Sequence, residues 1–241
     1  DDFPEGEMGE LARVFDRHVV RMRAFIERER TLSADMSHEL RTSLAVILSA
    51  TEILLDDETL TEKQKARIAR IDRATRDMGE LGTALLLMAR EEHLVSSGGG
   101  CVVAGVIEKA VDKHRLLLAN KPVQVELHTD PALEVPADCA LVDILVSNLV
   151  RNAFSYTASG TVIIRQDAHG LSIADTGKGI PGYAVDQVFL RHFRDMASEG
   201  AGIGLSLVKR ICDRFGWQLR LESRENSGTS VTILFNQGGS D

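Results

Sequence analysis

The sequence has no run of about 20 consecutive apolar residues, the length that a membrane-spanning helix needs. It also lacks the basic stretch followed by an apolar stretch that opens a secretory signal. We therefore expect these 241 residues to be soluble as they stand. The chain is nevertheless 44% hydrophobic and 27% charged, a composition that excludes intrinsically disordered and collagen-like classes.

Cysteine is scarce, and basic charge does not dominate. The three cysteines are far apart, odd in number and without paired spacing: Cys101, Cys139 and Cys212. This pattern predicts free, mostly buried thiols in a reducing compartment rather than a disulfide framework or a zinc site. The net charge of −8 offers no basic face for a nucleic acid, so we predict no nucleic-acid partner.

The first 95 residues contain little glycine or proline, and their apolar residues recur at spacings of three and four. This periodicity predicts one long helix to about residue 55, and Thr59 or Thr61 has the capping-box spacing that opens a second. A helix of about 49 residues would be roughly 73 Å long. The shorter second helix could not cover the whole apolar stripe along it. We therefore predict that two copies form a dimeric four-helix bundle.

A Ser-Gly stretch at residues 96–100 predicts a linker and a domain boundary. After it, strand-like alternation is interleaved with helical periodicity, which predicts an α/β sandwich with a mixed sheet and helices on one face. The expected helices are 106–119, 141–153 and 203–215. The expected strands are 123–127, 161–166, 171–174, 218–221 and 230–235.

The long helix contains the segment Ser-His-Glu-Leu-Arg-Thr-Ser-Leu at residues 37–44. His38 and Thr42 are four residues apart, so they share one face of a helix. A neutral imidazole is nucleophilic near pH 7, and the carboxylate of Glu39 can select its tautomer and stabilise the developing charge. An isolated His-Glu pair is most often an ordinary surface feature, so this motif needs support from elsewhere in the chain.

Three further motifs lie in the second half. Asn148 and Asn152 share a helical face, where amides can orient a hydrated Mg²⁺ without neutralising it. Asp175 leaves a strand into the Gly-Lys-Gly turn 177–179, where a carboxylate can accept from an amino group and the backbone can approach a ligand. The glycine-rich segment 200–204 opens a helix, whose N-terminal N–H groups suit a triphosphate. Each motif alone has a structural alternative, as a cap, a packing asparagine or an ordinary turn.

Taken together, in this order and spacing, the motifs resemble a sensor histidine kinase of two-component signalling over almost the whole chain. Residues 37–44 are similar to the phosphoacceptor box of the dimerisation domain. Residues 148–157, 175–180 and 200–205 are similar to the N, G1 and G2 boxes of the ATP-binding fold shared with gyrase, Hsp90 and MutL. Residues 6–15 are similar to the last helix of a HAMP signal-relay module.

The resemblance implies a domain order and a location. The expected segments are 1–30, the end of a HAMP-like helix; 31–95, dimerisation and histidine phosphotransfer; 96–100, linker; 101–237, catalytic ATP-binding domain; and 238–241, tail. It also implies a homodimer that forms the cytoplasmic portion of a bacterial inner-membrane sensor. Its expected partner is the receiver domain of a response regulator.

The resemblance also implies the chemistry, with ATP and Mg²⁺ as cofactors. His38 would attack the γ-phosphoryl group, and Glu39 would accept the proton from the other ring nitrogen. Thr42 would orient the water that dephosphorylates the receiver. Asn148 and Asn152 match the positions that hold Mg²⁺.

Other positions match the family's nucleotide-binding residues. Asp175 matches the aspartate that reads the adenine amino group. The remaining implied positions are Arg151, Tyr156, Gly177, Lys178, Gly179, Ile180, Phe193, Gly200, Gly202, Ile203, Gly204, Leu205 and Thr229.

Three residues depart from the family pattern. Ser43 replaces the usual proline, Ser155 a lysine that reaches the phosphates, and His192 a phenylalanine of the ATP lid. The candidates to supply the missing cation are Lys178, Arg151 and Arg194. Two rival functions remain open at this point: a conformational ATPase, and a catalytically silent nucleotide-binding dimeric scaffold.

Overall fold

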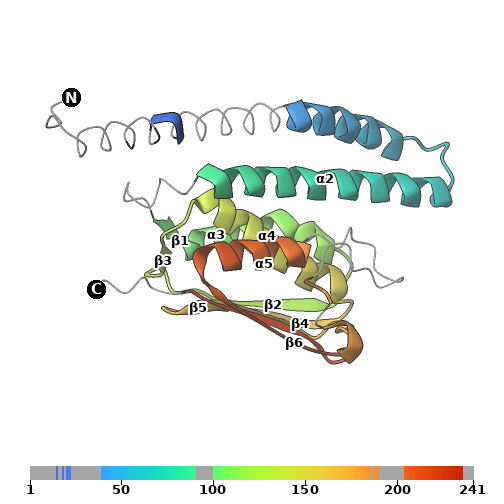
Figure 1. Ribbon diagram of the computed structural model, residues 1–241. Helices are drawn as coiled ribbons and strands as arrows, with labels where there is room; N and C mark the ends of the chain where they lie inside the picture. Colours follow the sequence, from blue (N-terminus) through green and yellow to red (C-terminus); the bar gives the residue numbers. More distant parts are fainter. Residues whose placement is uncertain are drawn as a thin grey trace, which may run out of the picture.

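The computed structural model describes residues 15, 18, 20–22, 39–90, 100–185, 187–189 and 204–235. A hairpin of two helices lies along an α/β sandwich, and the helices of the sandwich lie between the hairpin and the sheet (Figure 1). Within the described residues, no helix is both long and apolar enough to cross a membrane. Residues 1–14 of the HAMP-like segment, and most of the segment between Pro181 and Gly204, lie outside the described part.

The hairpin confirms the two helices predicted for the first part of the chain. Its first helix is continuous over the described residues 39–55, and α2 spans Glu62–Arg90. The capping box forms at Thr61: its N–H donates to Oε1 of Gln64 at 2.9 Å, and the N–H of Gln64 donates to the Thr61 hydroxyl at 3.4 Å. The N–H of Thr59 instead donates to Asp57 within the turn.

The second part is the predicted mixed sheet with helices on one face. The sheet order is β2-β4-β5-β7-β6, in which only the β2–β4 pair is parallel. Its strands are β2 Val123–His128, β4 Gly160–Gln166, β5 Gly170–Asp175, β6 Gln218–Arg224 and β7 Gly228–Leu234. The helices over one face are α3 Val103–His114, α4 Cys139–Tyr156 and α5 Gly204–Phe215 (Figure 1). Two short 3-10 helices are η2 Arg115–Leu118 and η3 Gly182–Ala184.

The prediction of one helix over 106–119 was only partly correct. The α-helix begins earlier, at Val103, and ends at His114, after which the chain tightens into η2. Asn120 then adopts a left-handed conformation with φ 64°, which a short polar side chain tolerates and a helix does not continue. A small antiparallel pair, β1 Cys101–Val102 with β3 Glu134–Val135, was not predicted because two-residue strands carry no periodicity.

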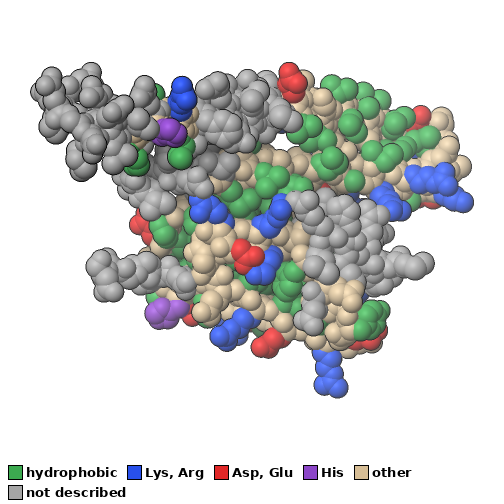
Figure 2. Space-filling view, viewed as in Figure 1, with side chains coloured by type: hydrophobic (Ala, Val, Ile, Leu, Met, Phe, Trp, Pro, Cys, Tyr) green, Lys and Arg blue, Asp and Glu red, His purple; other side chains and the backbone are tan. Residues whose placement is uncertain are grey.

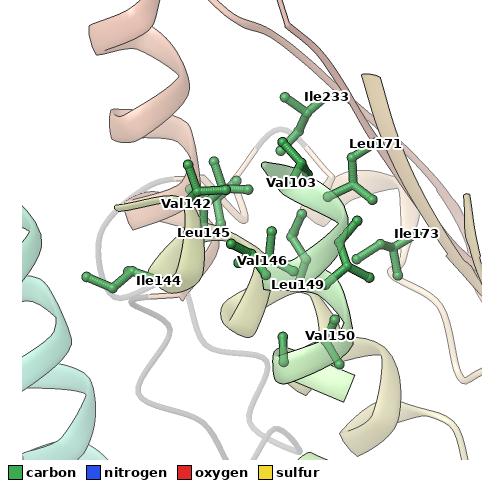
Figure 3. Close-up of a cluster of buried hydrophobic side chains, with 14 of the residues drawn as sticks. Val103, Val142, Ile144, Leu145, Val146, Leu149, Val150, Leu171, Ile173 and Ile233 are labelled. Carbon is green, nitrogen blue, oxygen red and sulfur yellow. The ribbon is translucent and has the colours of Figure 1, made fainter. Parts of the chain in front are cut away.

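The core lies between α4 and the inner face of the sheet. Alternate residues of the central strands, such as Leu171 and Ile173 of β5, point toward the helices because side chains of a strand alternate between its faces. Leu145 and Leu149 of α4 meet them from the other side (Figure 3). Burial of one such side chain contributes about 1.5–3 kcal/mol, so this packing holds α4 in place.

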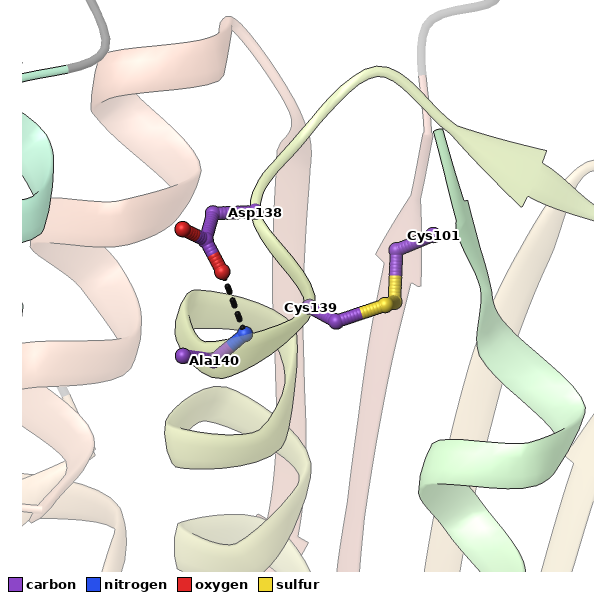
Figure 4. The surroundings of a disulfide bond; sticks show 4 residues. All are labelled: Cys101, Asp138, Cys139 and Ala140. Atoms are coloured by element: carbon purple, nitrogen blue, oxygen red, sulfur yellow. Dashed lines mark hydrogen bonds between the residues drawn. A yellow bond between two sulfur atoms is a disulfide. The ribbon is translucent and has the colours of Figure 1, made fainter. Parts of the chain in front are cut away.

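The prediction of three free thiols was wrong for two of them. Cys101 and Cys139 form a disulfide with their Cα atoms 5.0 Å apart (Figure 4). The sequence hides this pair because the cysteines are 38 positions apart, and only the β1–β3 pairing brings them together. Cys212 is free and buried as predicted, and burial raises the pKa of its thiol to about 12. The thiol argument for a reducing compartment therefore no longer holds.

The disulfide fastens β1 to the first residue of α4, so its loss has a measurable cost. Replacing both Cys101 and Cys139 by serine should lower the free energy of unfolding by roughly 2–4 kcal/mol, because the loop between them is no longer closed in the unfolded chain. Denaturant unfolding with and without a reducing agent measures this. The reductant should destabilise the wild type and leave the double variant unchanged. Equal stability of the oxidised wild type and the variant would contradict the assignment.

Candidate functional site

Helix α4 carries the polar residues of the site on the face turned toward α2. Asn148 is buried, with 1% of its surface exposed, and its side chain is fully engaged. Its Nδ2 donates to the carbonyl of Ile144 at 2.8 Å and to Glu80 of α2 at 3.1 Å. Its Oδ1 accepts from Nη2 of Arg151 at 2.7 Å. Asn152, one turn further along α4, lines an open cleft between α2 and the sandwich.

The turn after β5 presents Asp175 to the same cleft. The Oδ1 of Asp175 accepts from the N–H of Gly177 at 2.8 Å. Burial raises the pKa of this carboxyl, and hydrogen bonds from the backbone N–H groups of Gly177 and Thr229 act in the opposite direction. Thr229 of β7 is the residue paired with Asp175 in the sheet. The sheet thus fixes an acceptor and a hydroxyl side by side.

Gly177 is required by close backbone packing. A Cβ at this position would overlap the carbonyl oxygen of Tyr156 and lie 2.8 Å from Oδ1 of Asp175. The same turn places the Lys178 ammonium over the Tyr156 ring, 4.9 Å from its centroid, in cation–π contact. The end of α4 and the turn after β5 therefore form one wall of the cleft.

Sequence reasoning missed the group that holds this turn against the neighbouring strands. The hydroxyl of Ser223 in β6 accepts from the N–H of Ile180 at 2.8 Å. The same hydroxyl lies 2.9 Å from the carbonyl of Gly228 and 2.8 Å from the hydroxyl of Thr229. A single serine on an alternating strand gives no sequence signal, because only the strand order reveals what it contacts.

The N-terminus of α5 meets α4 at this site. Gly204 lies so close that a Cβ there would be 2.6 Å from Oδ1 of Asn148. The first N–H groups of an α-helix have no partners within the helix and favour an anion. Gly200, Gly202 and Ile203, which were predicted to continue this phosphate-binding segment, lie outside the described residues, as does Phe193 of the lid.

The structure gathers most of the predicted nucleotide-binding residues around one cleft of about 1560 Å³. The predicted residues that line it are Arg151, Asn152, Tyr156, Asp175, Lys178, Gly179, Ile180, Gly204, Leu205 and Thr229. His114 also lines it, and burial, with the charges of Lys113 and Arg151, lowers the pKa of its imidazole to about 4. His114 is therefore neutral at pH 7.

The opposite wall of the cleft belongs to the hairpin. Arg41 and Leu44 of the first helix line it, together with Asp77 and Glu80 of α2. Glu39 and Thr42 lie on the same exposed stretch of the first helix as Arg41. His38 lies outside the described residues, so its position relative to the cleft stays a prediction. The acidic residues of α2 were not predicted as part of the site.

Asn148 and Asn152 are the predicted metal ligands. Among the described residues there is no group of three or more His, Cys, Asp or Glu side chains that could hold a metal ion. Mg²⁺ bound with a nucleotide needs only one or two protein oxygens beside phosphates and water. The amide oxygens of Asn148 and Asn152 fit that requirement, provided that Oδ1 of Asn148 exchanges Arg151 for the ion.

Two family models match the chain. Residues 28–94 match the His Kinase A (phospho-acceptor) domain, and residues 137–238 match the histidine kinase-, DNA gyrase B-, and HSP90-like ATPase. Sensor protein CutS of Streptomyces coelicolor is 30% identical over 96% of this chain and 58% of its own length. The phosphate regulon sensor protein PhoR of Pseudomonas aeruginosa is 30% identical over 91% of this chain and 52% of its own.

A solved structure supports the same assignment. The mycobacterial sensor histidine kinase MprB is 26% identical and superposes with a TM-score of 0.51, over 57% of this chain and 97% of that one. The chain spans little more than half the length of the curated relatives CutS and PhoR. One family model covers the phosphoacceptor region, another covers the ATP-binding region, and the sensor proteins align along nearly the whole sequence. This chain therefore belongs to the sensor histidine kinases of two-component systems.

Proposed function

We propose that this chain is the catalytic portion of a sensor kinase that phosphorylates its own His38 with ATP and passes the phosphoryl group to an aspartate of a receiver domain. A ring nitrogen of His38 attacks the γ-phosphorus, the bond to the bridging oxygen breaks, and ADP leaves. Glu39 accepts the proton of the other ring nitrogen. Phosphoryl transfer depends mainly on positioning and electrostatic stabilisation, which this cleft is suited to supply.

The observation that carries the proposal is a cleft with nucleotide chemistry on one wall and the acceptor segment on the other. Asp175 offers a partly buried acceptor for an amino group of the base, and Gly204 opens the helix that would receive the phosphates. Arg41, three residues from His38, lines the opposite wall. Asn148 and Asn152 would hold Mg²⁺, which neutralises charge on the phosphates when bound.

Of the two candidate cations within the described residues, Arg151 is better placed than Lys178 to replace the lysine that usually stands at position 155. Arg194 lies outside the described residues. Its Nη2 lies 2.7 Å from Oδ1 of Asn148 and 3.6 Å from where a Cβ of Gly204 would be. The guanidinium therefore lies between the proposed metal ligand and the start of α5. Lys178 lies over the Tyr156 ring, in the turn that carries Asp175, which suits the base or the ribose better.

The proposal includes a homodimer in a bacterial sensor whose other parts are anchored in the membrane. Hydrophobic side chains gather along the hairpin (Figure 2), and the exposed ones include Leu40, Ile47, Leu54, Ile71, Met78 and Leu85. Leu40, Ile47 and Leu54 of the first helix are seven residues apart, as are Ile71, Met78 and Leu85 of α2, which is the repeat of a helical packing seam. A second copy of the hairpin would cover them in a four-helix bundle.

Autophosphorylation is tested with γ-labelled ATP and Mg²⁺ on the purified chain and a His38→Gln variant. The wild type should retain a label that is lost in acid and survives base, because phosphoramidates have that lability. The variant should carry none. Label on both proteins would exclude His38 as the acceptor, and tight ATP binding without label on either would favour the silent scaffold.

Nucleotide binding should depend on the absence of a side chain at Gly177. Gly177→Ala should weaken ATP binding at least roughly ten-fold, because the added Cβ pushes the turn away from Tyr156 and moves Asp175. Gly182→Ala is the matched control, since a Cβ there meets nothing within 4 Å. Calorimetric titration with ATP and Mg²⁺ measures both. Equal ATP affinities of the two variants would show that this turn is not part of the nucleotide site.

Phosphatase activity on the receiver is tested separately from kinase activity. Thr42→Ala should retain autophosphorylation and lose most of the dephosphorylation of a phosphorylated receiver domain, because no hydroxyl then orients the attacking water. The neighbouring exposed Ser43→Ala variant serves as the control. Unchanged dephosphorylation rates in Thr42→Ala would contradict this role.

A further inference from the structure

Two carboxylates of α2 contact the polar face of α4 across the cleft. The Oδ1 of Asp77 lies 3.0 Å from Nη1 of Arg151, and Oε2 of Glu80 lies 3.8 Å from Nη2 of the same guanidinium. Asp77 is only 5% exposed and Arg151 22%. These are not loose surface pairs, because both charges are largely removed from water and depend on each other.

Glu80 also engages the proposed metal ligand. It accepts a hydrogen bond from Nδ2 of Asn148, while Arg151 donates to Oδ1 of that amide. Both ends of the Asn148 side chain are therefore occupied: Glu80 holds the amide nitrogen, and Arg151 holds the oxygen that would bind a cation. One end of the Asn148 amide donates a hydrogen bond to the carbonyl of Ile144, so that end is the nitrogen.

Asp77 and Glu80 of α2 occupy a position that suits an anion. It is bounded by the Arg151 guanidinium, the amide of Asn148 and the start of α5 at Gly204. A guanidinium pairs with carboxylates and phosphates by the same fork of N–H donors. Asp77 and Glu80 thus supply from within the chain the type of charge that a triphosphate would bring.

We propose that Asp77 and Glu80 form an acidic latch that competes with the phosphates of Mg²⁺-bound ATP for Arg151 and Asn148, so that nucleotide loading and release of α2 from α4 are coupled. The inference rests on the proposed nucleotide site and adds its regulation. In the latched state the α2 carboxylates pair with Arg151, and Glu80 also holds Nδ2 of Asn148. In the loaded state they bind the nucleotide and its metal, and the two carboxylates return to water. Anything that moves α2 then changes nucleotide affinity.

The coupling is reciprocal, which gives two independent measurements. In the first, the nonhydrolysable analogue AMPPNP with Mg²⁺ is titrated into the full chain and the Asp77→Asn/Glu80→Gln variant. The variant should bind roughly 5- to 50-fold more tightly, because the competing charges are gone while the side-chain shapes remain. Its melting curve checks that it is folded.

The matched control removes the same charge elsewhere on the hairpin. Glu58→Gln/Glu62→Gln changes two exposed acids at the turn and the start of α2, away from Arg151. Its affinity for AMPPNP should equal that of the wild type. If both double variants gained affinity equally, the effect would be the general loss of negative charge, and the latch would be refuted.

The second measurement detects the contact in the wild type first and then checks it in the variant. Amide hydrogen exchange of the wild type should become faster in α2 around residues 76–84, and slower at the start of α5, when AMPPNP and Mg²⁺ are added. In the Asp77→Asn/Glu80→Gln variant, α2 should exchange fast without nucleotide. Unchanged or increased protection of α2 in the loaded wild type would overturn the latch.

The outcomes separate the two proposals. If the wild type and every variant fail to bind AMPPNP, the nucleotide site itself is refuted and the latch with it. If the wild type binds with an affinity equal to that of Asp77→Asn/Glu80→Gln, only the latch is refuted, and the proposed function stands.

Discussion

The packing of α4 between the sheet and α2 is the constraint on which the rest of the structure depends. One side of this helix carries leucine and valine side chains into the core, and the other side carries Asn148, Arg151 and Asn152. The Asp138 side chain caps its first turn by accepting from the N–H of Ala140, and the disulfide holds Cys139 (Figure 4). The core packing thereby sets the direction and depth of the polar groups, which line or adjoin the same cleft as Asp175 and Gly204.

The same helix joins the two parts of the chain. Salt bridges at a fully exposed surface contribute little, but Asp77 and Arg151 are both largely buried, so separating them without new partners would be costly. A nucleotide with its metal provides such partners. In the proposed latch, the cost of separating this buried ion pair links the movement of α2 to nucleotide binding.

Much of the fold followed from local signals. The period of the apolar residues predicted the hairpin and the five-stranded sheet, and the spacing of Asn148, Asn152 and Asp175 predicted side chains that line or adjoin one cleft. What sequence reasoning missed depends on contacts between distant segments. The Cys101–Cys139 bond needs the β1–β3 pairing, and Ser223 needs the order of the strands. Asp77 and Glu80 resemble any charged helical residues until α2 lies against α4.

In the proposed latch, α2 and a nucleotide compete for the same groups on α4. The most direct test is a crystal structure of the chain with Mg²⁺ and AMPPNP. We expect Arg151 and Asn148 to contact the phosphates and the metal, the base to lie against Asp175, and Asp77 and Glu80 to have separated from α4. A bound nucleotide with the Asp77–Arg151 and Glu80–Asn148 contacts both intact would contradict it.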